Sequence, residues 1–148
     1  MRRFLMVLVV VIAGCGGTGT TPTTADSPSP SPTTNIGQIV FGMAISEDRH
    51  RITAPSSTVS RAFPGILWFV VTFDEAPGAP SLTATLTRTS GGGATVTWSQ
   101  PALMSDPQAV TFADGRALGE LGALQPGVYV LRYLRDKAVL AEGSFEVN

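Results

Sequence analysis

Cysteine and histidine are almost absent from this chain of 148 residues, which holds only Cys15 and His50. One cysteine cannot close an internal disulfide, and a structural transition-metal site needs several cysteines or histidines. Thiol and imidazole chemistry are therefore confined to two residues. We expect no metal site and no cofactor.

Charged residues are also scarce. They make up 14% of the chain, against about a quarter in an average soluble protein. The net charge is −1, and Arg2-Arg3 is the only basic run, so the sequence offers no electrostatic surface for nucleic acid. The hydrophobic content of 43% is enough for a core. The length fits one domain with an appendage.

The N-terminus has the anatomy of an export signal. Arg2 and Arg3 form a short positive region, and residues 4–13 are apolar. This apolar stretch is shorter than the about 20 residues that a membrane-spanning helix needs. It ends in Ile12, Ala13, Gly14 and then Cys15, an aliphatic residue and two small residues before the single cysteine.

These four residues resemble the lipobox of bacterial lipoproteins. The resemblance implies cleavage between Gly14 and Cys15, and fatty acylation of the Cys15 sulfur, for example with palmitate. Small side chains let a peptidase approach the backbone. Two acyl chains anchor a protein stably in a membrane, whereas a single chain binds only weakly. Residues 1–14 would then be a lipoprotein signal peptide. The alternatives are a generic secretory signal with an incidental cysteine, or a short membrane anchor.

We therefore expect Cys15→Ser to abolish incorporation of a clickable fatty acid, because the serine hydroxyl is a poor substitute for the thiol in lipid transfer. The measurement is in-gel fluorescence of the chain after metabolic labelling. Label retained by the variant would contradict the lipoprotein hypothesis.

Residues 15–35 read as the acylated cysteine followed by a linker. Gly, Thr, Ser and Pro fill nearly all of this segment, which cannot bury enough apolar surface to fold. Its Ser-Pro repeats favour polyproline II at about 3.1 Å per residue, so the stalk could reach roughly 60 Å. It is also a candidate for O-glycosylation. In lipoproteins of two-membrane bacteria, an Asp after the acylated cysteine is associated with retention in the inner membrane. Gly16 stands at this position here, so in such a bacterium the resemblance to lipoproteins favours the outer membrane.

The remaining residues, 36–148, are typical of an all-β domain. Short apolar runs alternate with clusters of Gly, Pro, Asp and Ser, which predicts strands and turns. Val96 and Trp98 are expected to share a face, and a weak helical segment is expected at 118–124. The predicted strands are 39–45, 58–63, 65–73, 82–88, 94–100, 109–113 (ending at Asp114-Gly115), 128–134 and 144–147.

Seven or eight strands in this length predict a two-sheet β-sandwich. The segment 124–130, Leu-Gln-Pro-Gly-Val-Tyr-Val, is similar to the entry to a late strand in immunoglobulin-like and fibronectin type III-like domains. The resemblance implies that Tyr129 forms a tyrosine corner. The inter-sheet disulfide of antibody domains is absent, because no cysteine follows Cys15. Fold alone implies no function.

The segment 66–73 is apolar on both of its faces. Leu67, Phe69, Val71 and Phe73 form one face, and Ile66, Trp68 and Val70 form the other. A sheet face that meets solvent is usually polar. Ile66, Trp68 and Val70 are therefore a candidate partner surface, unless a loop of the same chain covers them.

No segment carries a convincing catalytic or metal-binding motif. The charged cluster 47–51 includes His50 but is typical of a solvated turn, and Asp74-Glu75 lacks the repeated acids of a calcium loop. Residues 90–93 lack the Gly-Lys-Ser/Thr of a phosphate-binding loop, and Gly-x-Ser-x-Gly is absent. We therefore assign no catalytic residue.

The sequence thus favours a non-catalytic, exported lipoprotein, anchored through Cys15 to the cell membrane or outer membrane. Its domain would bind a protein or an envelope polymer, with the Trp68 face and the loops 47–51 and 90–93 as contact surfaces. One alternative is an accessory subunit or inhibitor of an envelope enzyme. Another is a hydrolase on a sandwich scaffold with His50 as its base.

Overall fold

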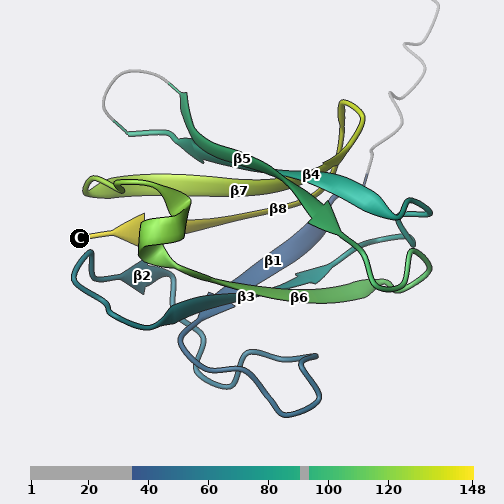
Figure 1. The fold of residues 1–148 in the computed structure, drawn as a ribbon, viewed down its shortest axis with the longest axis horizontal. Helices are drawn as coiled ribbons and strands as arrows, with labels where there is room; N and C mark the ends of the chain where they lie inside the picture. The colour runs from purple at the N-terminus through teal and green to yellow at the C-terminus, as the bar shows by residue number, and fades with distance from the viewer. Residues whose placement is uncertain (1–34, 91–93) are drawn as a thin grey trace, which may run out of the picture. The chain divides into compact units, whose positions relative to one another are not determined.

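The computed structural model describes residues 35–90 and 94–148 (Figure 1). The predictions for Cys15, the lipobox, the linker up to residue 34 and the loop at 91–93 lie outside these residues. No helix in the described residues is long and apolar enough to cross a membrane. The elements are β1 (Gly37–Gly42), β2 (Thr58–Val59), β3 (Ile66–Thr72), β4 (Ser81–Arg88), β5 (Thr95–Leu103), β6 (Thr111–Ala117), the 3-10 helix η1 (Leu118–Leu121), β7 (Gly127–Arg135) and β8 (Ala138–Val147).

The prediction of an all-β domain with seven or eight strands is confirmed, and every predicted segment contains part of a strand. Several local predictions were wrong. The predicted strand 58–63 shortens to Thr58–Val59, and the last strand begins at Ala138 rather than at residue 144. β1 ends at Gly42 rather than at residue 45. β6 continues through Asp114-Gly115, although this dipeptide is typical of a turn. Val96 and Trp98 do not share a face, because the register shifts between Leu86 and Thr87 of the paired β4 and leaves a bulge in β5.

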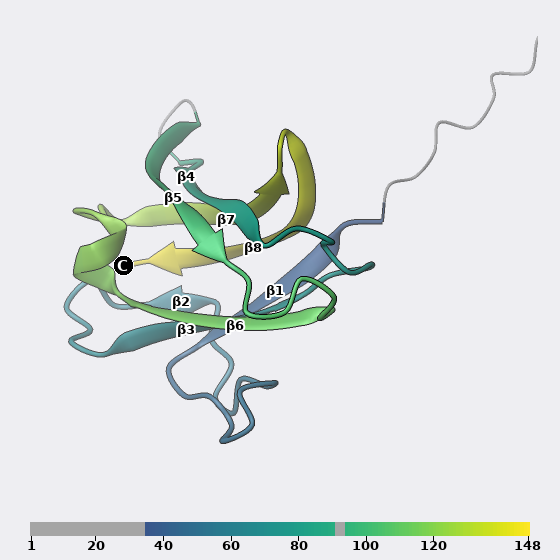
Figure 2. The ribbon, with the colours of Figure 1, turned by 45° about the vertical axis from the view of Figure 1, so that its right-hand side comes forward.

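The two-sheet arrangement was also wrong, because the strands form one hydrogen-bonded sheet in the order β5-β4-β7-β8-β1-β3-β6, with β2 added beside β8. β1 is the joint between the two halves of this sheet. It pairs with β3 antiparallel, and with β8 parallel through two residue pairs, Gly37 with Ala141 and Gln38 with Glu142. The sheet curls at this joint, so that its halves face each other (Figure 2).

Glycine makes the joint sterically feasible. A Cβ atom at Gly143 of β8 would lie 2.6 Å from the carbonyl oxygen and 2.7 Å from the Cβ atom of Ile39 in β1. A Cβ atom at Gly37 would meet the carbonyl oxygen of Thr72 and lie 2.8 Å from the Cα atom of Phe73. Any larger residue at either position would push β1 away from its neighbours.

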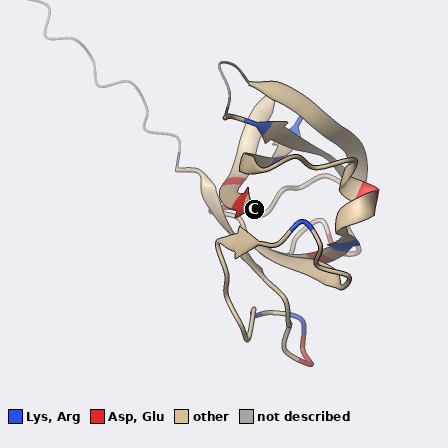
Figure 3. Cartoon of the chain, turned by 90° about the vertical axis from the view of Figure 1, so that its left-hand side faces the viewer, with Lys and Arg blue, Asp and Glu red and all other residues tan. Residues whose placement is uncertain are grey.

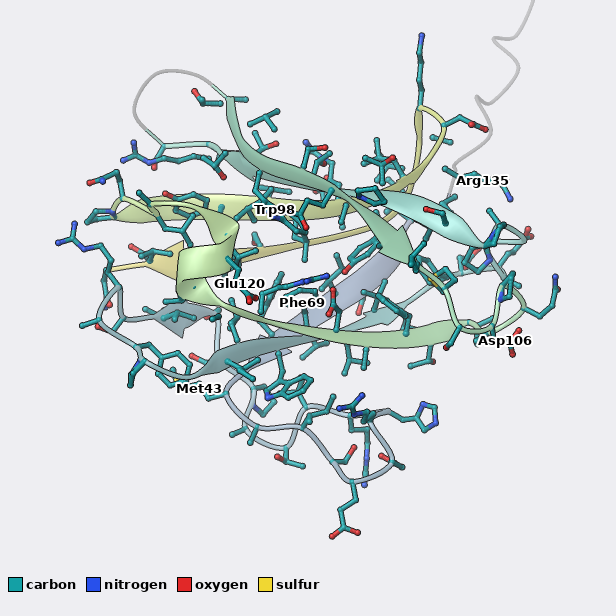
Figure 4. All side chains as sticks on the ribbon, in the orientation of Figure 1. Met43, Phe69, Trp98, Asp106, Glu120 and Arg135 are labelled. Atoms are coloured by element: carbon teal, nitrogen blue, oxygen red, sulfur yellow. The ribbon has the colours of Figure 1, made fainter. Side chains whose placement is uncertain are left out.

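The core lies between the two halves. Leu67, Phe69, Val71 and Phe73 are at most 3% exposed, which confirms the predicted inner face of this segment. β7 contributes Tyr129, Leu131 and Tyr133 to the same core, and Figure 4 shows Phe69 and Trp98 between the halves. Burial of each large apolar side chain contributes about 1.5–3 kcal/mol, so these alternating strands supply most of the driving force.

β5 and β6 are the two ends of the sheet, and among the described residues neither pairs with a further strand. The N–H of Gly115 donates to the Asp114 carboxylate, and the N–H of Ala117 donates to Glu120. Carboxylates that occupy the N–H groups of a strand oppose pairing with another chain. The Arg116 guanidinium lies 6.0 Å from the Trp98 ring and bridges from β6 to β5.

Candidate functional site

The outer face of β3 is the candidate site, and its three predicted residues differ in exposure. Ile66 is 45% exposed and Trp68 is half-buried, but Val70 is only 5% exposed. The prediction that Val70 belongs to an open surface was therefore wrong. Val70 pairs with Val40 of β1 and Ala113 of β6, so it lies at the middle of a three-strand face.

A loop of the same chain covers part of this face. Residues 43–57 leave β1 and fold back, with isolated bridges between Ile45 and Ile52 and between Gly42 and Pro55. The position of a Cβ atom on Gly42 is occupied by the side chain of Ile52 and the carbonyl of Ala54. Gly42 is the register partner of Trp68, so the covering loop passes directly beside the tryptophan.

Trp68 is held between a glycine and an arginine. Its indole lies against Gly115 of β6, where a Cβ atom would approach the ring carbon Cε3 to 2.5 Å. The guanidinium carbon of Arg49 lies 5.6 Å from the ring centroid. Such a cation–π contact is worth about 0.5–1 kcal/mol at an exposed site. The structure thus brings together the charged loop 47–51 and the Trp68 face, which the sequence could only treat separately.

Around Trp68 the face remains open. Val40, Met43 and Ile66 are 44%, 41% and 45% exposed, and each lies within two positions of Trp68 or of its partner Gly42. We call Val40, Met43, Ile66, Trp68 and Arg49 the Trp68 surface. Single exposed apolar side chains are ordinary, whereas a group on one face is typical of a contact site.

Sequence reasoning missed two members of this surface. Val40 alternates with the buried Ile39 and Phe41, so its outward orientation could have been inferred from the period of the strand. Met43 could not, because in a strand that runs to residue 45 it would share a face with Ile39 and Phe41, which are buried. The chain leaves the strand after Gly42, and Met43 then becomes exposed.

The charged loop is organised by local hydrogen bonds. The Asp48 carboxylate accepts hydrogen bonds from the Ser46 hydroxyl and from the N–H of His50. These bonds hold the pKa of Asp48 below its usual value. His50 is exposed at this turn, and Asp74 and Glu75 are exposed after β3. In residues 35–90 and 94–148, no three His, Cys, Asp or Glu side chains gather to hold a metal ion.

The two tyrosines of β7 have different hydrogen-bonding environments. The Tyr129 hydroxyl donates to the carbonyl oxygen of Gln125 at 2.8 Å and accepts from the N–H of Gln125 at 2.9 Å. A tyrosine corner makes this kind of contact with the backbone a few residues upstream. The Tyr133 hydroxyl is buried and has no hydrogen-bond partner among the described residues. Burial, and secondarily the nearby Asp114 charge, raises the pKa of Tyr133 far above its usual value.

Comparison with known proteins gives a likeness to solved structures only. No protein-family model matches the chain, and no curated protein matches it. Among solved structures, the chain is similar to an immunoglobulin-like protein from Pseudomonas aeruginosa, with 19% sequence identity and a TM-score of 0.48. The match covers 74% of this chain and 91% of the other.

Proposed function

We propose that this chain is a lipid-anchored, non-catalytic module that binds a partner of the bacterial envelope through the Trp68 surface. The observation that carries the proposal is the exposure of three large apolar side chains around a half-buried tryptophan. The outer side of a sheet in a solvated domain is normally polar, so an apolar outer face needs an explanation.

The chemistry of the Trp68 surface favours a protein partner. Tryptophan and arginine are enriched where binding energy concentrates, and Arg49 already lies over the Trp68 ring. A partner that places an apolar side chain beside Ile66 and a carboxylate near Arg49 would complement both features. The acids Glu47 and Asp48 in the same loop oppose a polyanion.

The lipobox pattern at Ile12–Cys15 supports the anchor, and the Tyr129 contact with Gln125 supports an immunoglobulin-like domain. Anchoring would hold the domain at the membrane at a high local concentration. A rigid sheet and a fixed loop would then present the Trp68 surface with little loss of entropy on binding.

Site-specific photo-cross-linking in living cells tests this function. A benzophenone amino acid replaces Ile66 in the full chain, and a matched control carries it at Leu103, which is 77% exposed on β5. We expect a discrete protein adduct from position 66 and none from position 103. Adducts that are absent from position 66, or equal at both positions, would contradict the proposal. A diffuse adduct that glycan-degrading enzymes remove would identify the partner as an envelope polymer instead of a protein.

A further inference from the structure

A separate, concave site lies at the end of the domain that carries η1, away from the Trp68 surface. It is a pocket of about 280 Å³, lined by Arg61 from the segment between β2 and β3 and by residues of η1 and the turn that follows it. Figure 3 looks onto this end, with the C-terminus toward the viewer. No residue of the Trp68 surface lines the pocket.

The floor of the pocket is apolar and its walls are fixed. Leu118 and Leu124 line it and are only 8% and 5% exposed, so they belong to the core. Tyr129 holds Gln125, another lining residue, through both of its backbone groups. The N–H of Arg61 donates to the backbone oxygen of Asn148 at 2.8 Å. The site is therefore largely preformed, as small-molecule sites usually are.

The lining of the pocket carries charge of one sign, which is positive. Arg61 is the only charged residue of its lining in the described part of the chain. Its guanidinium has no hydrogen bond or ion pair among the described residues, whereas Arg116 and Arg132 pair with Asp114 and Glu142. A guanidinium presents several donors in a plane, a geometry that fits a carboxylate.

We propose that this pocket binds a small molecule with a carboxylate head and a short apolar body. The carboxylate pairs with Arg61, and the apolar body lies on Leu118 and Leu124. The volume is near the lower end of small-molecule sites, about 300 Å³, which limits the ligand to a short chain or a single ring. This site goes beyond the proposed partner binding, because it uses different residues and a different ligand class.

Gly119 offers a direct way to fill the pocket. It is a lining residue, and a Cβ atom added there would meet nothing within 4 Å. The variant Gly119→Leu therefore adds a Cβ atom that clashes with nothing, and its side chain extends from a lining position of the pocket. Arg61→Gln removes the charge from an exposed side chain and should leave the fold intact.

The test is a titration of the ¹⁵N-labelled full chain with sodium hexanoate and, separately, with hexanol, followed through backbone amide shifts. We expect saturable shifts at Gly119, Gly122 and Ala123. Arg61→Gln should weaken hexanoate binding about tenfold, as expected for loss of a hydrogen-bonded charge, and should leave hexanol unchanged. Gly119→Leu should abolish the binding of both probes. The control Arg51→Gln, an arginine outside the pocket, should bind both as the parent chain does.

Three results would overturn the proposal. The first is hexanoate binding that Arg61→Gln leaves unchanged. The second is hexanol binding as tight as that of hexanoate, which would remove the role of the charge. The third is the absence of saturable shifts at the three pocket amides. Dispersed amide spectra of each variant would show that the fold is intact, so that loss of binding reports on the pocket.

Discussion

Tyr129→Phe should lower the free energy of unfolding by about 2 kcal/mol, because the backbone N–H and carbonyl of Gln125 lose their partner. The ring itself is retained, so the change removes little apolar burial. The measurement is urea unfolding followed by circular dichroism, with the slope of the transition unchanged, so that the shift in midpoint reports stability.

Tyr133→Phe is the matched control in the same strand. Its hydroxyl is buried without a partner among the described residues, so its removal should leave stability unchanged or raise it by about 1 kcal/mol. The two variants delete the same atom from the same residue type. Equal losses of stability in both would contradict the assignment of the Tyr129 contact as the stabilising one.

Gly143→Ala should lower the free energy of unfolding by about 3 kcal/mol, the upper end of the range for overpacking, because the obstacle includes backbone. The added methyl group would lie 2.6 Å from the Ile39 carbonyl oxygen and 3.0 Å from Cε2 of Phe41. Relief of these contacts requires β1 to move off β8, where the strand pairing between the halves of the sheet consists of only two residue pairs. Chemical unfolding measures the loss.

Gly119→Ala is the control for this substitution, since its methyl group meets nothing within 4 Å. It should change stability by no more than about 0.5 kcal/mol. If Gly143→Ala proved equally harmless, the close approach of β1 and β8 would be wrong, and with it the single curled sheet.

The sequence predicted the elements whose pattern is local. In residues 66–73 and 82–88 the side chains alternate with the period of a strand, and this period identified both the strands and the buried face of β3. The Leu-Gln-Pro-Gly-Val-Tyr segment placed Tyr129 at the start of β7 because proline and glycine define the turn before it.

Features that depend on distant residues could not be predicted. The joint between β1 and β8 involves segments from opposite ends of the described chain, and no local pattern encodes it. Val70 is buried because Val40 and Ala113 flank it, which is a property of the strand order. Gly115 reads as a turn residue, yet it lies inside β6, where the indole of Trp68 leaves no space for a side chain.

The central claim is that the Trp68 surface is open to a partner rather than part of the core. Acrylamide quenching of Trp68 fluorescence tests it most directly, in a Trp98→Phe chain so that one indole remains. Trp68 is half-buried between Gly115 and Arg49, so we predict clear quenching, weaker than that of free tryptophan, and an emission maximum shifted to the red of a core indole. Emission that acrylamide cannot quench, at the wavelength of a buried indole, would contradict the claim.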